Sequence, residues 1–424
     1  MMSASGGFVI GAPSSGSGKT TIALGLMRAL SRRMAVRPAK SGPDYIDPQF
    51  HSTACGQPSM NLDAWAMSPD MLRGLACGEG LLIVEGAMGL FDGAPPNGDG
   101  SAADLAQLLG LPVVLVVDAA QMSHSVAALV RGFVTHRQAI KIGGIILNKV
   151  GSPRHEAMLR RALSSNNMPP VLGAFPRSDL SLPSRHLGLV QAHELPNLDG
   201  LLDHFADLAQ THVDLERLSQ LGQQVHGDIP TQSPPGQRIA VAQDIAFAFA
   251  YPHIISGWRT AGANVQTFSP LADDPVPDAD FVFLPGGYPE LHAARLAANT
   301  TFLKSLANAA QSSDIYGECG GYMSLGDGLI DADGTRHQMA GLLRLETSFA
   351  QRKRHLGYRK LTTQHAPLAG SWRGHEFHYA TTLSANGPAL FTATDAEGTA
   401  LQPMGLRQGR VCGSFAHLIS CRAT

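Results

Sequence analysis

The segment GAPSSGSGKTT, from Gly11 to Thr21, contains the residue types that bind a phosphate chain. Its small residues allow backbone N–H groups to surround an anion, while Lys19 can reach the outer phosphates and Thr20 can offer its hydroxyl to magnesium. Pro13 stands where the strict motif has its first glycine, which argues against the commonest GTPase and ATPase families. An ordinary Gly/Ser-rich turn is the alternative. The expected nucleotide contacts are Ser14, Gly16, Ser17, Gly18, Lys19, Thr20 and Thr21.

A second polar segment, KSGPDYIDPQFH, covers residues 40–51. Asp44 and Asp47 are three residues apart beside a proline turn, so both carboxylates can face the phosphate loop as magnesium ligands or as substrate-positioning groups. Lys40 adds a second cation. Asp-rich turns are common, so two turn-capping aspartates are the alternative interpretation.

Glu85 comes at the end of an expected buried strand, in VEGAMGLFDG (84–93). Sites in open α/β sheets lie at the carboxyl ends of strands, so Glu85 is expected to hold magnesium directly or through water. Asp92 lies on the following glycine-rich loop, where it can face the substrate or cap a turn.

Three further polar residues follow later strands. Asp118 can support the groups around the metal, and Asn148 and Lys149 can touch the nucleotide base. Structural roles are at least as favoured for all three.

The segment YGECGGYM (316–323) places Cys319 between glycines. Such glycines permit a sharp strand-to-helix turn that holds a thiol at the positive end of the next helix, where a thiolate is favoured. We therefore predict that Cys319 is a nucleophile, with a buried structural cysteine as the alternative.

A thiol nucleophile needs a base, and GSFAHLIS (413–420) places His417 at the end of a strand-like segment. His375 and His378 in RGHEFHYA compete for this role or line a pocket. We choose His417 as the base.

The segment LPGGYPEL (284–291) supplies glycines after a strand end. Backbone N–H groups at glycines can approach a reacting carbonyl closely. The amides of Gly287 and Gly320 are therefore expected to form an oxyanion hole for a tetrahedral intermediate.

The elements that must position these residues are short apolar strands alternating with helices. In the first half, strands are expected at 8–11, 81–86, 113–118, 143–150 and 170–175, and helices at 18–31, 101–110, 123–137 and 154–165. Uniformly apolar strands of this kind are typical of a parallel sheet covered by helices on both faces. A loop is expected at 176–190.

The pattern stops in a Gln-, Pro- and Ser-rich stretch and then resumes. We predict an α/β domain with a phosphate loop at 1–212, a linker at 213–237 and a second α/β domain at 238–424. Strands of the second domain are expected at 238–244, 265–268, 281–287 and 314–321.

Composition limits the classes of partner. The formal net charge of −2 gives no general attraction to nucleic acid, and no apolar run is long enough to cross a bilayer. The five cysteines are widely spaced and form no CxxC pair, so we expect a cytoplasmic protein without disulfides.

Together these motifs resemble a known family. The second half resembles the class I glutamine amidotransferases, and the first resembles the dethiobiotin-synthetase-like amidoligases. Joined in this order, with KSGPDYIDP, VEGAMGLFDG, LPGGYPE, GECGGYM and GHEFHY, they resemble the cobyrinate/hydrogenobyrinate a,c-diamide synthases of cobalamin biosynthesis. The resemblance covers nearly all of the chain.

The resemblance implies roles for individual residues. Cys319 would be the glutaminase nucleophile and His417 its activator, although Ile419 stands where many amidotransferases have the glutamate that orients the base. The metal ligands would be Thr20, Asp47 and Glu85. Substrate binding and catalysis in the ligase site are assigned to Lys40, Asp44, Tyr45 and Asp92.

The implied reaction uses ATP and Mg²⁺ to convert a corrin carboxylate into an acyl phosphate, which ammonia from L-glutamine then amidates. Ammonia must travel by a protected route, because NH₃ is largely protonated in neutral water. Hydrogenobyrinate is preferred to cobyrinate as acceptor, and a homodimer is expected. The basic cluster RKRH (352–355) can meet the acid substrate, but a solvated loop is favoured.

Two alternatives stay open. One is another glutamine-dependent tetrapyrrole ligase, either cobyric acid synthase or a nickel-sirohydrochlorin diamide synthase. The other is a partition-type P-loop ATPase that binds partners and carries an inert second domain.

Overall fold

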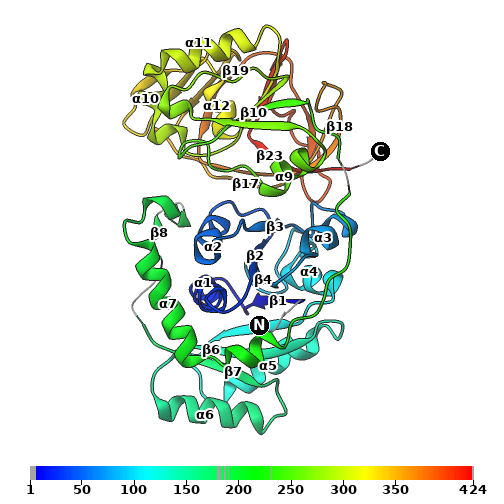
Figure 1. Ribbon diagram of the computed structural model, residues 1–424, viewed down its shortest axis with the longest axis vertical. Helices are drawn as coiled ribbons and strands as arrows, with labels where there is room; N and C mark the ends of the chain where they lie inside the picture. The colour runs from blue at the N-terminus through cyan, green and yellow to red at the C-terminus, as the bar shows by residue number, and fades with distance from the viewer. Residues whose placement is uncertain are drawn as a thin grey trace. The chain divides into compact units, whose positions relative to one another are not determined.

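The computed structural model describes residues 6–422 except 179–181, 183, 186, 187, 190 and 231. The chain divides into two compact units, Met1–Pro230 and Thr231–Thr424, each with its own sheet and core (Figure 1). The prediction of an α/β fold with a parallel sheet in the first half is confirmed, because every strand pairing in that sheet is parallel.

The sheet of the N-terminal unit has the strand order β3-β2-β4-β1-β5-β6-β7. All five residues of β4 are buried, as expected for a strand covered on both faces. Because β1 lies between β4 and β5, the chain reverses its direction of progress across the sheet at β1, where ligands bind in such folds. The bounds are β1 Gly6–Gly11, β2 Val36–Ser41, β3 Met60–Leu62, β4 Leu81–Glu85, β5 Val113–Asp118, β6 Ile142–Val150 and β7 Val171–Pro176.

Helices cover both faces of this sheet. Figure 1 shows α1 (Lys19–Ser31), α2 (Asp47–Cys55) and α7 (Leu198–His212) on one side, and α3 (Pro69–Ala76), α4 (Ala102–Leu109) and α5 (Ser125–His136) on the other. A further helix, α6 (Pro153–Ser164), packs beside α5. The apolar side chains of α1 and α7 share one buried core, which fixes the start of α1 against the sheet.

The expected linker at 213–237 begins with folded residues. It contains α8 (Leu215–Ser219), and Leu215 and Leu218 are buried in the core of the N-terminal unit. Gln223 and Gly7 exchange two backbone hydrogen bonds of 2.8 and 3.0 Å. The division between the units falls after Pro230, within the expected linker. The expected loop at 176–190 includes the short strands β8 (Ser184–Arg185) and β9 (Gly188–Leu189), and its other residues lie partly outside the described part of the chain.

The main sheet of the C-terminal unit has the order β11-β10-β12-β13-β22-β21, and only the pairing of β21 with β22 is antiparallel. Its strands are β10 Arg238–Ala242, β11 Asn264–Phe268, β12 Phe281–Leu284, β13 Asp314–Glu318, β21 Leu406–Gln408 and β22 Val411–Ser414. Its helices are α9 Pro252–Thr260, α10 Ala293–Ala298, α11 Thr300–Ala309 and α12 Gly320–Ser324.

Two further sheets accompany this main sheet, and the sequence pattern did not predict them. The first is antiparallel and the second is mixed, because β14 and β16 pair in parallel. One has the order β20-β17-β18-β23 and the other β15-β14-β16-β19. Several of these strands are only half-buried, so they lack the apolar runs that reveal the parallel strands. Their bounds are β14 Gly328–Ile330, β15 Arg336–Gln338, β16 Leu345–Ser348, β17 His355–Thr363, β18 Gly370–His378, β19 Thr381–Ala385, β20 Thr392–Thr394 and β23 Ala416–Arg422.

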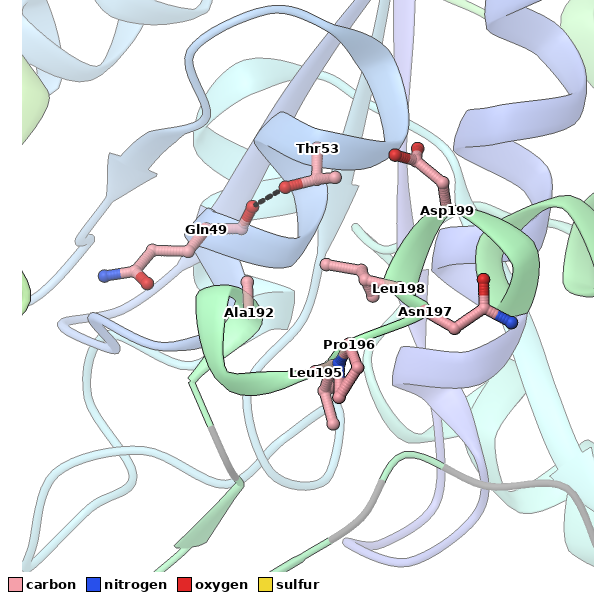
Figure 2. A pocket seen from close by; sticks show the side chains of 8 residues that line it. All are labelled: Gln49, Thr53, Ala192, Leu195, Pro196, Asn197, Leu198 and Asp199. Carbon is pink, nitrogen blue, oxygen red and sulfur yellow. Dashed lines mark hydrogen bonds between the residues drawn. The ribbon is translucent and has the colours of Figure 1, made fainter.

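A cavity of about 570 Å³ opens beside α2 in the N-terminal unit, lined by residues of α2 and of the segment 192–199 (Figure 2). Thr53 and Gln49 face it from α2, and their hydrogen bond is internal to that helix. None of the residues predicted to carry chemistry lines this cavity. Among the described residues, no helix is both long and apolar enough to cross a membrane.

Candidate active sites

The phosphate loop connects the end of β1 to the start of α1. Gly16 and Gly18 have φ angles of 79° and 87°, which glycine adopts at low cost. At Gly18 a Cβ would lie 2.2 Å from the Nδ2 atom of Asn148, so a side chain has no space there. Asn148 Nδ2 donates to the Ser17 carbonyl at 2.9 Å, which fixes the loop. This contact is a structural one, and a contact of Asn148 with the nucleotide base stays a prediction.

Lys19 extends across this loop and bonds backbone carbonyls. Its Nζ donates to Ser14 O at 3.4 Å and to Met88 O. Burial lowers the pKa of Lys19, although Glu85 opposes that effect. The ammonium is held where carbonyl oxygens partly replace its water. Charged phosphate oxygens are a favourable exchange for these neutral acceptors.

A buried ionic cluster lies beside the loop. The strand register aligns Ile10, Glu85 and Lys40, so the carboxyl ends of β1, β4 and β2 meet at one edge. Glu85 accepts from Thr20 Oγ1 at 2.7 Å and lies 3.1 Å from Lys40 Nζ. Lys40 also forms an ion pair with Asp47. The structure thus brings together the lysine, threonine and two acids that the sequence singled out.

Neighbouring charges favour the ionised forms of Glu85 and Lys40. Burial would raise the pKa of Glu85, but Lys40 and His51 outweigh it and hold the pKa well below its ordinary value. Burial would likewise lower the pKa of Lys40, yet Asp47 and Glu85 raise it above its ordinary value. The charges of Glu85 and Lys40 are therefore stabilised by their neighbours. Asp47 differs, because burial and the charge of Asp44 raise its pKa well above its ordinary value.

His51 belongs to this cluster, and the sequence analysis gave it no role. Its Nε2 lies 2.6 Å from Glu85 Oε2, and its side chain is fully buried. His51 is four residues after Asp47 on α2, so both project from one helix face. This spacing of four residues from Asp47 is the sequence signal that could have identified His51.

The oxygen donors of the cluster fit a magnesium ion. Thr20, Asp47 and Glu85 offer a hydroxyl and two carboxylates, which are the hard ligands that Mg²⁺ prefers. They come from three separate elements, α1, α2 and β4.

Asp44 and Asp92 make the turn contacts that were their alternative interpretation. Asp44 Oδ1 accepts from the backbone of Ile46 at 2.7 Å and of Asp47 at 3.3 Å. Asp92 Oδ2 accepts from Gly89 N at 2.9 Å. Tyr45 is buried in the same turn as Asp44. The roles of these residues toward a substrate stay predictions.

Lys149 and Asp118 form an ion pair of 2.7 Å at the ends of β6 and β5. Asp118 also accepts from Ala120 N at 3.0 Å. The contacts of both residues are therefore structural ones.

In the C-terminal unit, Cys319 stands in the sharp turn between β13 and α12. Its φ of 48° and ψ of −104° are strained for a residue with a side chain, as is typical of nucleophile elbows. The side chain is 4% exposed, and Sγ lies 3.9 Å from Phe377 O.

The expectation of a resting thiolate differs from the structure. Burial raises the pKa of the Cys319 thiol, and the carboxylate of Glu290 raises it further. The following helix has only five residues, so its dipole is small. The thiol is therefore neutral at rest and needs a base at the moment of attack.

His417 lies beside this thiol. A Cβ built on Gly286 would lie 2.9 Å from His417 Nε2 and 3.2 Å from Cys319 Cβ, so both residues border the same glycine. The structure brings together the predicted nucleophile and base, and Gly286 leaves room between them. Burial lowers the pKa of His417 to about 3, with smaller effects from His375 and His378. The neutral imidazole can accept a proton.

The predicted oxyanion donors lie close together. A Cβ on Gly320 would lie 3.0 Å from Gly287 N, and one on Gly287 would lie 2.0 Å from Ala246 O. Only glycine fits at both positions. Their amides are thus near neighbours beside Cys319.

The competing histidines occupy other positions of the same sheet. His375 lies opposite His417 in the register of β18 and β23. His378 Nε2 lies 2.9 Å from Glu376 Oε1, and Glu376 Oε2 lies 2.7 Å from Arg359 Nη2. Burial would raise the pKa of Glu376, but His378 and Arg359 lower it to about 2.

Glu318, directly before the nucleophile, is the second residue to which the sequence analysis gave no role. It is 2% exposed, accepts from Leu418 N at 2.9 Å, and lies 3.6 Å from His417 Nδ1. The basic residues Arg352, Lys353 and Arg354 are exposed, as a solvated loop requires.

Comparison with known families matches both halves. Residues 8–190 match the CobQ/CobB/MinD/ParA nucleotide binding domain, and residues 238–423 match the CobB/CobQ-like glutamine amidotransferase domain. The fold and sites thus define a nucleotide-binding unit joined to a glutamine amidotransferase unit.

Several curated relatives are similar over nearly the whole chain. The hydrogenobyrinate a,c-diamide synthase of Brucella anthropi is 54% identical over 97% of this chain and 98% of the relative. Those of Rhizobium meliloti and Rhodobacter capsulatus are 53% and 51% identical, covering 97% and 98% of this chain and 99% and 98% of the relatives. The chain belongs to the hydrogenobyrinate a,c-diamide synthase family.

Proposed function

We propose that this chain catalyses the ATP-driven, glutamine-dependent amidation of the a and c carboxylates of hydrogenobyrinate. The observation that carries the proposal is the presence of two separate sets of reactive groups in one chain. The first set consists of the phosphate loop and the adjacent buried Lys40–Glu85 cluster. The second set consists of Cys319 and the neighbouring His417. The full-length similarity to relatives of that name supports the acceptor.

In the ligase unit, backbone N–H groups of residues 14–21 bind the triphosphate, and Lys19 leaves its carbonyl partners for phosphate oxygens. A carboxylate oxygen of the acceptor forms a bond to the terminal phosphorus as the bond to ADP breaks, which gives an acyl phosphate. Ammonia then attacks the acyl carbon, phosphate leaves, and the nitrogen loses a proton to water. Positive charge on Lys19 and Lys40 stabilises the developing negative charge.

We propose that Thr20, Asp47 and Glu85 hold Mg²⁺ in this unit. The ion would neutralise phosphate charge when bound. Lys40 and His51 orient the carboxylates of Asp47 and Glu85, because they contact those carboxylates directly. Asp44, Tyr45 and Asp92 are proposed to position the acceptor acid.

In the glutaminase unit, Cys319 Sγ attacks the side-chain amide carbon of glutamine as its proton moves to His417. The amides of Gly287 and Gly320 donate to the oxyanion. His417 returns the proton to the departing nitrogen, so ammonia leaves and a glutamyl thioester remains. Water hydrolyses the thioester to glutamate and restores the thiol.

The decisive experiment supplies the protein with Mg-ATP, glutamine labelled with ¹⁵N in its amide, and one of three acids: hydrogenobyrinate, cobyrinate or cobyrinate a,c-diamide. Mass spectrometry counts the labelled amides. Two labels on hydrogenobyrinate are expected. Labels only on the a,c-diamide would contradict the proposal and favour the cobyric acid synthase alternative.

The partition-type alternative predicts no glutamine hydrolysis at all. Glutamate release by the wild-type protein, absent in Cys319→Ser, would exclude it. A homodimer and a cytoplasmic location stay predictions. Light scattering tests the first, and fractionation of cells tests the second.

A further inference from the structure

We propose that Glu318 is the positioning residue that orients His417 in glutamine hydrolysis. This inference rests on the proposed function of the Cys319 site. Ile419 occupies the place where many amidotransferases carry an orienting glutamate, and it is buried in the apolar core. The role would therefore pass to the residue before the nucleophile.

The geometry of Glu318 suits this role because its two oxygens are used differently. Oε1 accepts from the backbone N–H of Leu418 at 2.9 Å, which ties the carboxylate to the residue next to His417. Oε2 lies 3.6 Å from His417 Nδ1. The carboxylate is thus anchored on β23 and faces the imidazole, and a small approach of the two groups completes a hydrogen bond.

The two edges of the imidazole face different groups. Nδ1 faces Glu318, whereas Nε2 borders the space at Gly286 next to Cys319. A proton on Nδ1, donated to Glu318, leaves Nε2 with the free lone pair that can accept the proton of the thiol. The opposite tautomer would present an N–H to the thiol and could not accept its proton.

The proton movement then balances. The proton of Sγ moves to Nε2 as the new carbon–sulfur bond forms, so His417 becomes an imidazolium. The carboxylate of Glu318 stabilises that charge through Nδ1–H. When ammonia leaves, Nε2 returns the proton and the imidazole is neutral again.

The surroundings of the pair make this stabilisation important. Tyr316 from β13 neighbours Glu318, and His375 and His378 from β18 act on His417. Burial raises the pKa of Glu318 to about 8, although Leu418 N–H and Tyr316 oppose the effect. Glutamine hydrolysis should therefore rise as pH increases through this range, because Glu318 must be ionised.

The test compares Glu318→Gln with the matched control Glu346→Gln. Glu346 is a carboxylate of the same unit that pairs with Arg336 at 2.7 Å on the surface. Glu318→Gln should lower kcat for glutamine hydrolysis by roughly 100-fold with little change in KM. It should also remove the activity rise near pH 8, while synthesis with added ammonia continues. The control should match the wild type in every respect.

Two further measurements separate orientation from folding. Glu318→Asp should recover part of kcat and keep a pH-dependent rise, because it retains a carboxylate. Nitrogen NMR of labelled His417 should show the Nδ1–H tautomer in the wild type and a mixture in Glu318→Gln.

The outcomes are distinguishable. Equal kcat and an equal pH profile in Glu318→Gln and the wild type would overturn the inference alone. Loss of ammonia-dependent synthesis in Glu318→Gln would also overturn it, because a structural defect would explain the change. Absence of glutamine hydrolysis in the wild type would overturn the inference and the proposed function together.

Discussion

The two sites contain buried carboxylates in opposite electrostatic states. In the N-terminal unit, Lys40 and His51 hold the pKa of Glu85 below its ordinary value. In the C-terminal unit, burial raises the pKa of Glu318 to about 8. Both side chains are almost fully buried, so the difference comes from their partners and not from depth. Glu85 thus keeps its charge beside the phosphate loop, whereas Glu318 gains its charge only as pH rises toward 8.

The largest expected effect comes from a change at the Cys319 site of the C-terminal unit. Cys319→Ser should reduce glutamine-dependent synthesis by roughly 10⁴-fold or more, because the nucleophile is lost. Synthesis with added ammonia should continue, since the phosphate loop and the Lys40–Glu85 cluster of the N-terminal unit are intact. Product is measured by mass spectrometry with each nitrogen donor. Cys412→Ala, which removes a buried thiol of the same sheet, is the control. Loss of both activities would contradict separate sites.

The next largest effect comes from a change in the phosphate loop of the N-terminal unit. Lys19→Ala should lower synthesis with either nitrogen donor by roughly 100- to 1,000-fold, because the phosphates lose a cation. Glutamine hydrolysis without the acid should persist. Lys141→Ala is the matched control, since Lys141 is exposed just before the amino end of β6. Unchanged synthesis in Lys19→Ala would refute the role of the phosphate loop.

A smaller effect is expected from the neighbour of Glu85. His51→Ala should reduce synthesis with both donors by roughly 10- to 100-fold and weaken the dependence on Mg²⁺, because Glu85 loses an orienting contact. Titration of activity with Mg²⁺ measures the change. His155→Ala, which alters a histidine of α6 in the same unit, is the control. An unchanged Mg²⁺ titration would exclude His51 from the site.

The smallest effect concerns stability. Because burial raises the pKa of Glu318 from 4.5 to about 8, the folded protein retains a proton there that the unfolded chain loses. This contribution to stability is complete below pH 4.5 and is lost as pH rises to 8. Glu318→Gln lacks it, so its Tm relative to the wild type should rise by roughly a few degrees over that interval. If the Tm of Glu318→Gln and the Tm of the wild type changed equally with pH between 4.5 and 8, the raised pKa of Glu318 would be contradicted.

Sequence reasoning located the groups that stand at strand ends. Glu85 ends β4 and Lys19 begins the helix after β1, and the carboxyl ends of these parallel strands share one edge of the N-terminal sheet, so their proximity was predictable. Cys319 follows β13 in the same way, at the carboxyl edge of the separate sheet of the C-terminal unit. The contacts of His51 and Glu318 were not, because each depends on the register of segments far apart in the chain.

The antiparallel strands illustrate the same limit. β17 and β18 carry half-buried residues without a continuous apolar run, so local pattern did not identify them. The expected thiolate at Cys319 failed for a related reason. The depth of a side chain and the charges around it are tertiary properties.

The backbone hydrogen bonds between Gly7 and Gln223 determine where the chain can be cut to express its two units separately. The backbone of the first strand is completed by a residue more than two hundred positions later, beyond α8. A fragment ending at 212 would remove Leu215 and Leu218 from the buried core of the N-terminal unit and would leave Gly7 without that partner. Dissection of the two catalytic halves into separately expressed proteins should therefore place the cut close to Pro230.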